Sequence, residues 1–441
     1  MTSYGGDSRF EVFISGHRWL FPAVIAFFCV FEYRLFAGRQ GVLSFIVVEL
    51  IGYAALLVYL ADTIIYPDMP KKQFQSLPRG VKTLWYYFLW TGLVSFGGIL
   101  AAGPYSLTRF KDLSPSLVVI FSVIFWANNK KAIRAVLAGY FLALVFNIGL
   151  AVLQANFNWP YINEVGFTAL AKMDFDGAVV RSGLAVGMYG HPNGLAMLLV
   201  PGVILLFGVL ISGHVSSKFR LASLFFLIAS VYSLVHTYSK GSLSWATWGC
   251  VLLLVHRIIP VRNFWLYLAV MIFTVSALLG IGLLKSHEIG GLGTMMGRWT
   301  HWAATIHVFL VHPQVLLFGN GSDYLLGTSL LYSHLSYTYP NSHNAYLNQV
   351  LLYGLPALFL WFFGVMSVLG YSAKRVEYIE NTFEGALLTP IIISVLALMG
   401  EYFFEPYVEG VTFQAQLFLL LGLAVKLASV NVNAPAPREE R

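Results

Sequence analysis

The sequence predicts an all-α polytopic membrane protein with about 12 transmembrane helices and a long external loop between spans 9 and 10. Two properties of the whole chain support this fold class. Of its 441 residues, 58% are hydrophobic and only 11% are charged, which is far from the composition of a soluble domain. The apolar residues also lie in long runs, and most of these approach the ~20 residues that a helix needs to cross a bilayer.

Twelve apolar runs follow one another along the chain, and each is a candidate span. Three of them, at residues 113–127, 242–256 and 386–399, are shorter than a perpendicular helix needs. The other nine lie at residues 19–36, 42–65, 83–101, 132–153, 194–211, 219–238, 263–284, 345–369 and 411–427. Together they predict a single transmembrane domain over residues 1–433, followed by a polar, Pro-rich cytoplasmic tail at 434–441 that we expect to be disordered.

The distribution of positive charge predicts the orientation. With both termini in the cytoplasm, 18 of the 27 Lys and Arg residues lie in or beside cytoplasmic loops, as the positive-inside rule requires. The long external segments are then residues about 154–189 and 285–342, and the second contains a helix-like stretch at 299–312 that is too short to span. Because long polar loops on a rigid scaffold often carry function, we expect the active site on the external face.

Composition also excludes some function classes. The formal net charge is +7, but the basic residues form short clusters between apolar runs, as in membrane loops, so nucleic-acid binding is not predicted. The two cysteines, Cys29 and Cys250, each lie inside an apolar run. This placement leaves neither a disulfide framework nor a thiolate metal site.

Four acidic residues have roles that the sequence leaves open. Asp174 and Asp176 form a D-x-D pattern like the metal-binding pair of nucleotide-sugar glycosyltransferases, but three-residue patterns are common and nucleotide sugars are not expected outside. Glu32 and Glu49 lie inside apolar runs. A carboxylate at membrane depth is costly, so we expect each of these two to pair with a neighbouring helix.

The most informative stretch is PNSHNAYLNQVLLYGLP at residues 340–356, where a long polar segment gives way to the tenth apolar run. Residues 340–342 are turn and cap types, so we expect His343 and Asn344 in the first helical turn at the membrane surface. An imidazole there titrates near neutral pH and lies beside backbone N–H groups that favour an anion. Acid/base chemistry on a charged substrate is one interpretation, and a simple helix cap with an interfacial histidine is the other.

Three cations come from separate places in the chain, yet the predicted topology puts all of them on the external side with His343. Arg181 precedes the sixth span, Lys240 lies in the short turn TYSKGS, and Arg298 lies in the Gly-rich GGLGTMMGRW. A charge in a tight, partly apolar turn needs a partner. A diphosphate would fit, because Arg binds its oxygens bidentately and Lys acts as a point charge. For each cation, a lipid-headgroup contact or an interfacial anchor is the alternative.

Two further groups of polar residues flank predicted spans. His191 and Asn193 open the sixth span as HPN, where Asn193 could orient a sugar hydroxyl, although Pro at a first helical position is also natural in any helix. Glu401, Glu405 and Glu409 fill an external turn that contains no basic residue. These carboxylates could bind acceptor hydroxyls or serve as an alternative base, and a solvated acidic turn is the other interpretation.

Several of these motifs together resemble the bacterial O-antigen ligase and O-antigen polymerase superfamily. They are SKG at 239–241, GRW at 297–299 followed by GNGSDY at 319–324, and SHNAYLNQVLLYGLP at 342–356. HPNGLA at 191–196 also looks like the motif that opens a span in many exopolysaccharide and O-antigen polymerases. The resemblance covers about residues 181–356, and the first five spans are similar only in number and hydropathy. The family's motif commonly has Arg where this chain has Lys240, which keeps the charge but not the bidentate geometry.

The resemblance implies a multi-pass protein of the bacterial inner membrane with a periplasmic active site and no cofactor or required metal. It implies a glycosyltransferase of lipopolysaccharide or exopolysaccharide biosynthesis, which transfers a glycan from a polyprenyl (undecaprenyl) diphosphate carrier to a sugar hydroxyl of an acceptor glycan or glycolipid. His343 would be the catalytic base, and Arg181, Lys240 and Arg298 would bind the diphosphate. Acceptor or sugar contacts would come from His191, Asn193, Asn344, Glu401 and Glu405. Besides donor, acceptor and lipid bilayer, other polysaccharide assembly proteins are candidate partners.

A flippase or transporter of polysaccharide or lipid-linked oligosaccharide, acting without bond cleavage, is the alternative. Such a protein should show symmetry between its halves, interrupted helices in corresponding positions and polar residues near the midplane. The sequence shows no convincing internal repeat, and its charged residues gather at the external ends of the runs. The enzyme is therefore the favoured prediction, with both ligase and polymerase activity open.

Overall fold

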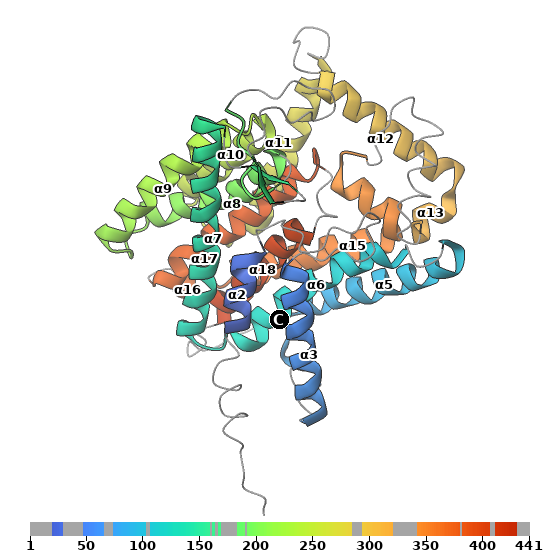
Figure 1. Ribbon diagram of the computed structural model, residues 1–441, viewed down its shortest axis with the longest axis horizontal. Coiled ribbons are helices and arrows are strands. Elements are labelled where there is room, and N and C mark those ends of the chain that lie inside the picture. Colours follow the sequence, from blue (N-terminus) through green and yellow to red (C-terminus); the bar gives the residue numbers. More distant parts are fainter. Residues whose placement is uncertain are drawn as a thin grey trace, which may run out of the picture.

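The computed structural model is a bundle of helices (Figure 1). It describes residues 20–29, 47–65, 74–102, 106–158, 161–163, 166–168, 183–189, 192–284, 293–320, 342–379, 382–405 and 411–429. Over these ranges the only strands are β1 (Tyr161–Asn163) and β2 (Gly166–Thr168), a small antiparallel pair. The remaining regular structure is helical, in agreement with the predicted fold class. The predicted tail at 434–441 lies outside the described residues.

Every predicted apolar run contains a helix. In chain order the helices are α2 (Leu20–Phe28), α3 (Val47–Ile65), α5 (Arg79–Ala102), α6 (Ser106–Trp126), α7 (Lys130–Phe157), α8 (Pro192–Ile211), α9 (Ser217–Val235), α10 (Lys240–Val255), α11 (Phe264–Leu284), α12 (Gly293–Val311), α13 (Pro313–Phe318), α15 (Ala345–Ala373), α16 (Val376–Ile379), α17 (Phe383–Glu401) and α18 (Val411–Ser429). Of the helices described, five are long and apolar enough to cross a membrane: α7, α8, α9, α15 and α18. These helices indicate a membrane protein, and the count of twelve spans stays a prediction.

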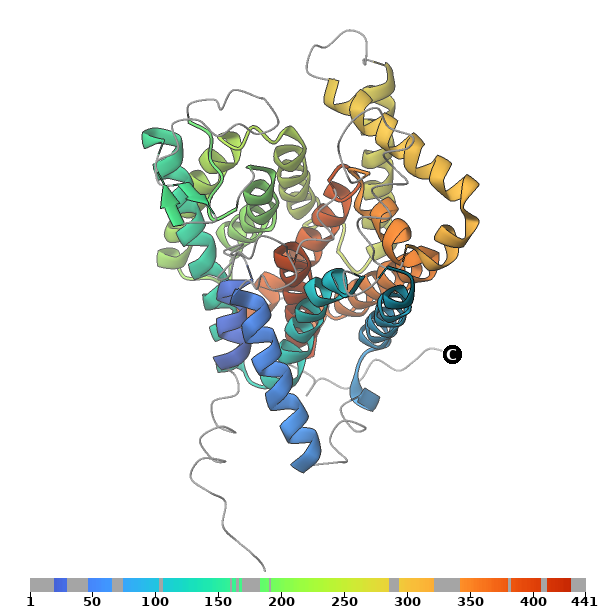
Figure 2. The same cartoon turned by 45° about the vertical axis from the view of Figure 1, so that its right-hand side comes forward.

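The centre of the bundle is formed by α8, α17 and α18. Most of the apolar residues of α8 and α18 are buried inside the protein, whereas α9 is largely exposed at the edge (Figure 1). Figure 2 shows the red helices of the C-terminal part in the middle of the molecule from a second direction. A helix that is apolar on all sides must be buried in protein or in lipid. Here α17 packs on α8 and α10, and α18 packs on α6.

A buried ion pair joins α3 to α6. Lys111 Nζ lies 3.4 Å from Glu49 Oε1, and Glu49 is 1% exposed. Burial of a lone carboxylate is costly, so a partner on a neighbouring helix is expected and is found. The run predicted at 113–127 is longer as α6 because its polar start, which includes Lys111, is also helical. Glu32 lies outside the described residues.

The helix that follows the SHN motif is broken rather than continuous over residues 345–369. Gly354 has φ 80° and ψ 172°, which divides α15 into two halves that run in different directions (Figure 1). Pro356, two residues later, has no N–H group to continue the helical hydrogen bonds. The half long enough to cross a bilayer is therefore residues 355–373, and His343 precedes a separate short segment at 345–353.

Other parts of the protein bond the backbone carbonyls that the break releases. Leu351 O accepts a hydrogen bond from the backbone N–H of Asn320 (2.9 Å). Tyr353 O accepts one from the indole N–H of Trp90 on α5 (2.8 Å). Since an unpaired carbonyl in an apolar interior is costly, these bonds stabilise the broken form of α15.

The end of α13 fits tightly against this break. Gly319, with φ 68°, follows α13, and a Cβ atom there would collide with the backbone of Leu352. A Cβ atom on Gly354 would collide with the carbonyl group of Leu317. Only glycine can occupy both positions without displacing backbone, so the two glycines set the angle between the halves of α15.

We expect Gly354→Ala to lower the melting temperature strongly, because the positive φ alone costs about 1–3 kcal/mol for a residue with a side chain and the contact with Leu317 adds to it. The matched control is Gly149→Ala on α7, where nothing lies within 4 Å of an added Cβ atom. There the change should be neutral or stabilising, since Ala favours a helix by about 1 kcal/mol. Thermal unfolding in detergent measures both variants, and equal melting temperatures would contradict the fit between α13 and α15.

Candidate functional site

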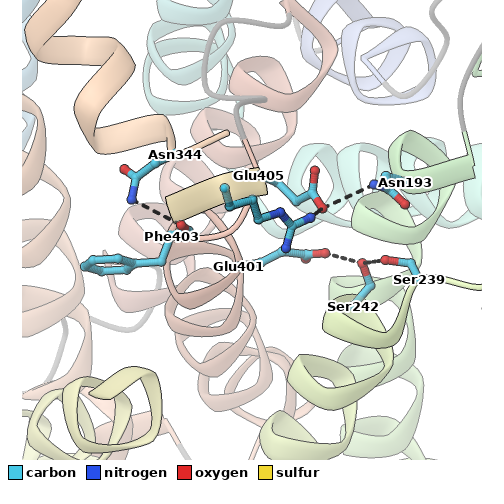
Figure 3. A network of polar contacts seen from close by, with 8 residues as sticks. Asn193, Ser239, Ser242, Asn344, Glu401, Phe403 and Glu405 are labelled. Atoms are coloured by element: carbon cyan, nitrogen blue, oxygen red, sulfur yellow. Dashed lines mark hydrogen bonds and ion pairs between the residues drawn. The ribbon is translucent and has the colours of Figure 1, made fainter. Parts of the chain in front are cut away.

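The ends of several helices that are distant in sequence meet at the turn that follows α17 (Figure 3). This turn, residues 402–405, leads from Glu401 at the end of α17 to Glu405. It is contacted by the starts of α8, α10 and α15 and by Arg298 from the N-terminal part of α12. We call this group of contacts the α17-end cluster.

Glu405 is the most highly connected carboxylate of the α17-end cluster. Its Oε1 accepts hydrogen bonds from Arg298 Nη2 (2.7 Å) and from Asn193 Nδ2 (3.2 Å), and the residue is 6% exposed. Burial raises the pKa of Glu405, and the positive charge of Arg298 opposes that shift. The alternative interpretation, in which this carboxylate belongs to a solvated acidic turn, is therefore wrong for Glu405. Glu409 lies outside the described residues.

Glu401 is also buried, at 1% exposed, and connects the cluster to α10. Its Oε1 accepts a hydrogen bond from Ser242 Oγ, which lies 2.9 Å from Ser239 Oγ. Lys240 is the first residue of α10 and its side chain is exposed, so the predicted short turn ends in a helix start. Lys240 therefore lies between Ser239 and Ser242 in the sequence, but its side chain does not contact Glu401 or Glu405.

Asn344 caps α15 and binds it to the turn after α17. Its Oδ1 accepts hydrogen bonds from the N–H groups of Tyr346 and Leu347 (both 3.0 Å), and its Nδ2 donates one to Phe403 O (3.1 Å). The N–H of Ala345 donates to the carbonyl of Tyr402 (2.9 Å). The side chain that was predicted to contact substrate thus has a structural role as N-cap.

His343 lies outside the helix, which corrects the expectation that it belongs to the first helical turn. Because Asn344 takes the cap position, the chain bends one residue earlier, and His343 has φ 48°. Next to it, Ser342 donates its N–H to Asn348 Oδ1 (3.0 Å), and its hydroxyl lies 2.5 Å from the same oxygen. These bonds hold the loop on the N-terminal side of His343.

His301 on α12 is a functional candidate that sequence reasoning missed. Its ring lies 5.3 Å from the ring of His343, measured between centroids. It follows Arg298 by three residues, and residues at that spacing share one face of a helix. This spacing within GRWTH was the available signal. Burial lowers the pKa of His301, which favours a neutral imidazole beside His343.

A second set of contacts holds the irregular segment at 183–189. Gln154 on α7 accepts hydrogen bonds from the N–H groups of Val186 (2.9 Å) and Gly187 (2.8 Å) and donates one to Gly187 O (3.0 Å). Asn147, about two helical turns earlier on α7, accepts a hydrogen bond from the N–H of Met188 (3.0 Å). Both amides are fully buried, so this segment is a fixed part of the protein core.

The predicted site residues are thus brought together in part. Asn193, Arg298, Glu401, Glu405 and Asn344 belong to the α17-end cluster, and His343 is joined to it through His301 on α12. Arg181, His191 and the pair Asp174 and Asp176 lie outside the described residues. Within the described part of the chain, no group of three or more His, Cys, Asp and Glu could hold a metal ion.

The α17-end cluster pairs one of the predicted diphosphate-binding cations, Arg298, directly with a predicted acceptor contact, Glu405. Two buried carboxyl groups lie close to the partly buried guanidinium group of Arg298, which supplies a counter-charge for Glu405. The arrangement offers a fixed guanidinium, amide and hydroxyl groups for hydrogen bonding, and two neighbouring imidazoles for proton transfer.

Comparison of the chain with protein-family models gives no match, and comparison with curated proteins gives none either. The resemblance to the O-antigen ligase and polymerase superfamily therefore stays a prediction that depends on the motifs themselves.

His301→Gln is expected to reduce the loss of stability in acid. The pKa of His301 is lowered from 6.5 in the folded protein, so below about pH 6.5 the unfolded chain binds a proton that the folded chain does not. The stabilisation by neutral His301 is complete above that pH and is lost as the pH falls below it.

Melting temperatures measured from about pH 7.5 down to about pH 5 test this, because the wild type should lose more stability than the Gln variant. The control is His214→Gln, since His214 is exposed and should leave the profile unchanged. Parallel pH profiles for wild type and His301→Gln would contradict the assignment.

Proposed function

We propose that the chain is a membrane glycosyltransferase of cell-surface polysaccharide assembly, of the O-antigen ligase or polymerase type. It would transfer a glycan from a polyprenyl diphosphate carrier to a sugar hydroxyl of an acceptor glycan or glycolipid. One observation carries the proposal: residues of the HPN, GRW and SHN motifs, which are far apart in sequence, gather around the turn after α17. Hydrophobicity alone does not require such a convergence.

The proposed orientation has twelve spans, both termini in the cytoplasm and a periplasmic site in a bacterial inner membrane. The starts of α8, α10 and α15 and the end of α17 are all external ends in this arrangement. They are also the ends that meet in the α17-end cluster, as a correct order of inside and outside loops requires (Figure 3). This agreement supports the proposed alternation of spans 6 to 11, and the positive-inside rule supplies the orientation.

In the proposed reaction, His343 accepts the proton of an acceptor hydroxyl, whose oxygen attacks the anomeric carbon of the donor sugar. The bond from that carbon to the phosphate oxygen breaks, and the diphosphate leaves with the electron pair. Arg298, with Arg181 and Lys240, stabilises the negative charge that grows on the leaving oxygen. His191 and Asn193 are proposed to contact the sugar or acceptor, whereas the buried side chains of Asn344, Glu401 and Glu405 are proposed to hold the helix ends in place. No step requires a cofactor or metal.

A flippase or transporter of the same lipid-linked glycan is the second candidate. The break of α15 at Gly354 favours it, because interrupted helices are common where transporters bind their substrates. Release of polyprenyl diphosphate by the purified protein, given the glycolipid that accumulates in cells lacking the gene, would support the enzyme. Movement of the glycolipid across a bilayer without cleavage would support the transporter.

We expect His343→Asn and Arg298→Ala each to lower the rate of polyprenyl diphosphate release about a hundredfold, as loss of a base or of a charge-stabilising donor commonly does. Asn is chosen at 343 because it tolerates the positive φ there, so the variant removes the base and keeps the backbone.

The matched controls are His312→Asn, at the start of α13, and Arg262→Ala, which breaks the surface ion pair with Glu377. Both controls should release polyprenyl diphosphate at rates near that of the wild type, in equal amounts of folded protein. Near-normal rates in His343→Asn and Arg298→Ala together would refute the proposed site.

A further inference from the structure

Arg298 has a fixed geometry in the α17-end cluster. Its side chain is 22% exposed, and its Nη2 donates to Glu405 Oε1 at 2.7 Å. A guanidinium group has five N–H donors in a planar fork, and this bond uses one of its terminal nitrogens. While Glu405 accepts from Nη2, the guanidinium plane of Arg298 is held in one orientation, and its other N–H donors point in fixed directions.

Glu405 is itself held in place, so it can fix the orientation of the Arg298 guanidinium group. Its carboxylate also accepts from Asn193 at the start of α8, and its backbone N–H donates to Glu401 O (3.2 Å). The same turn is fixed to α15 through the bond from Asn344 to Phe403 O. A carboxylate that is 6% exposed and bound on two sides has little freedom to move.

We propose that Glu405 is a positioning residue that holds the guanidinium group of Arg298 for the diphosphate of the lipid-linked donor. The inference rests on the proposed function, in which Arg298 binds that diphosphate. It gives Glu405 a different role from the acceptor contact expected from sequence, because a residue so deeply buried has little surface left for a substrate.

Two physical effects of Glu405 on an anion have opposite signs, which makes the inference testable. Its negative charge repels a diphosphate bound to Arg298, so its removal would tighten binding if charge dominated. Its hydrogen bond orders a long, flexible side chain, so its removal would weaken binding if positioning dominated. Our inference is that positioning dominates.

The test is a double-mutant cycle on the full-length protein in detergent, with farnesyl diphosphate as the probe of polyprenyl diphosphate binding. We expect Glu405→Ala to raise the dissociation constant about tenfold and Arg298→Ala to raise it at least as much. The double variant should bind no more weakly than Arg298→Ala, because Glu405 acts only through Arg298.

Glu49→Ala is the matched control, since it also breaks a buried ion pair but lies between α3 and α6. It should leave the dissociation constant unchanged. If Glu405→Ala does not fold, Glu405→Gln replaces it: the Gln carbonyl oxygen can still accept from Arg298, so binding should be weakened less than about tenfold.

The inference would be overturned if Glu405→Ala bound farnesyl diphosphate as tightly as the wild type or more tightly. It would also be overturned if Glu405→Ala raised the dissociation constant by the same factor in the wild type and in the Arg298→Ala variant, or if Glu49→Ala weakened binding. The release of polyprenyl diphosphate by the wild type separates this failure from failure of the proposed function. A wild type that releases the product while the cycle shows no coupling refutes only the positioning role. A wild type that neither binds the probe nor releases the product refutes both.

Discussion

A carboxylate cannot remain charged in an apolar interior without a partner, and the end of α17 is built around that constraint. Glu401 and Glu405 lie one helical turn apart and are both buried. Their partners come from α8, α10 and α12, and each partner lies more than a hundred residues from its carboxyl group in sequence. The requirement to compensate two buried carboxyl groups thus draws distant segments to the end of α17. The ion pair between α3 and α6 follows the same rule elsewhere in the bundle.

The backbone is subject to a similar constraint. Where a helix stops or bends inside the bundle, its N–H and C=O groups need new partners. Side-chain amides supply many of them: Asn344 caps α15, and Gln154 bonds the irregular segment at 183–189. Trp90 does the same for Tyr353 at the break of α15. These bonds give irregular segments defined positions, which a site made from several helix ends needs.

The mixture of charges has consequences for the kind of ligand that would fit. A guanidinium group paired with a buried carboxylate contributes direction more than net positive potential. An anion bound there would depend on the geometry of the donors around it and on cations farther away. The rings of His301 on α12 and of His343, just before α15, lie 5.3 Å apart between centroids, so a proton acceptor at His343 would have a second imidazole beside it.

The sequence by itself determined where the helices lie, because hydrophobicity and run length are local properties of the chain. It also determined that Glu49 needs a partner and that a helix begins close to residue 345, since burial cost and capping preference belong to residue types. Only the tertiary structure decided which groups pair: Lys111 with Glu49, Glu405 with Arg298 and Asn193, and His301 with His343. The break at Gly354 had a local signal in the sequence YGLP, but its angle depends on the packing of α13 against it. Pairing across helices depends on how whole elements pack, and no local pattern in the chain contains that information.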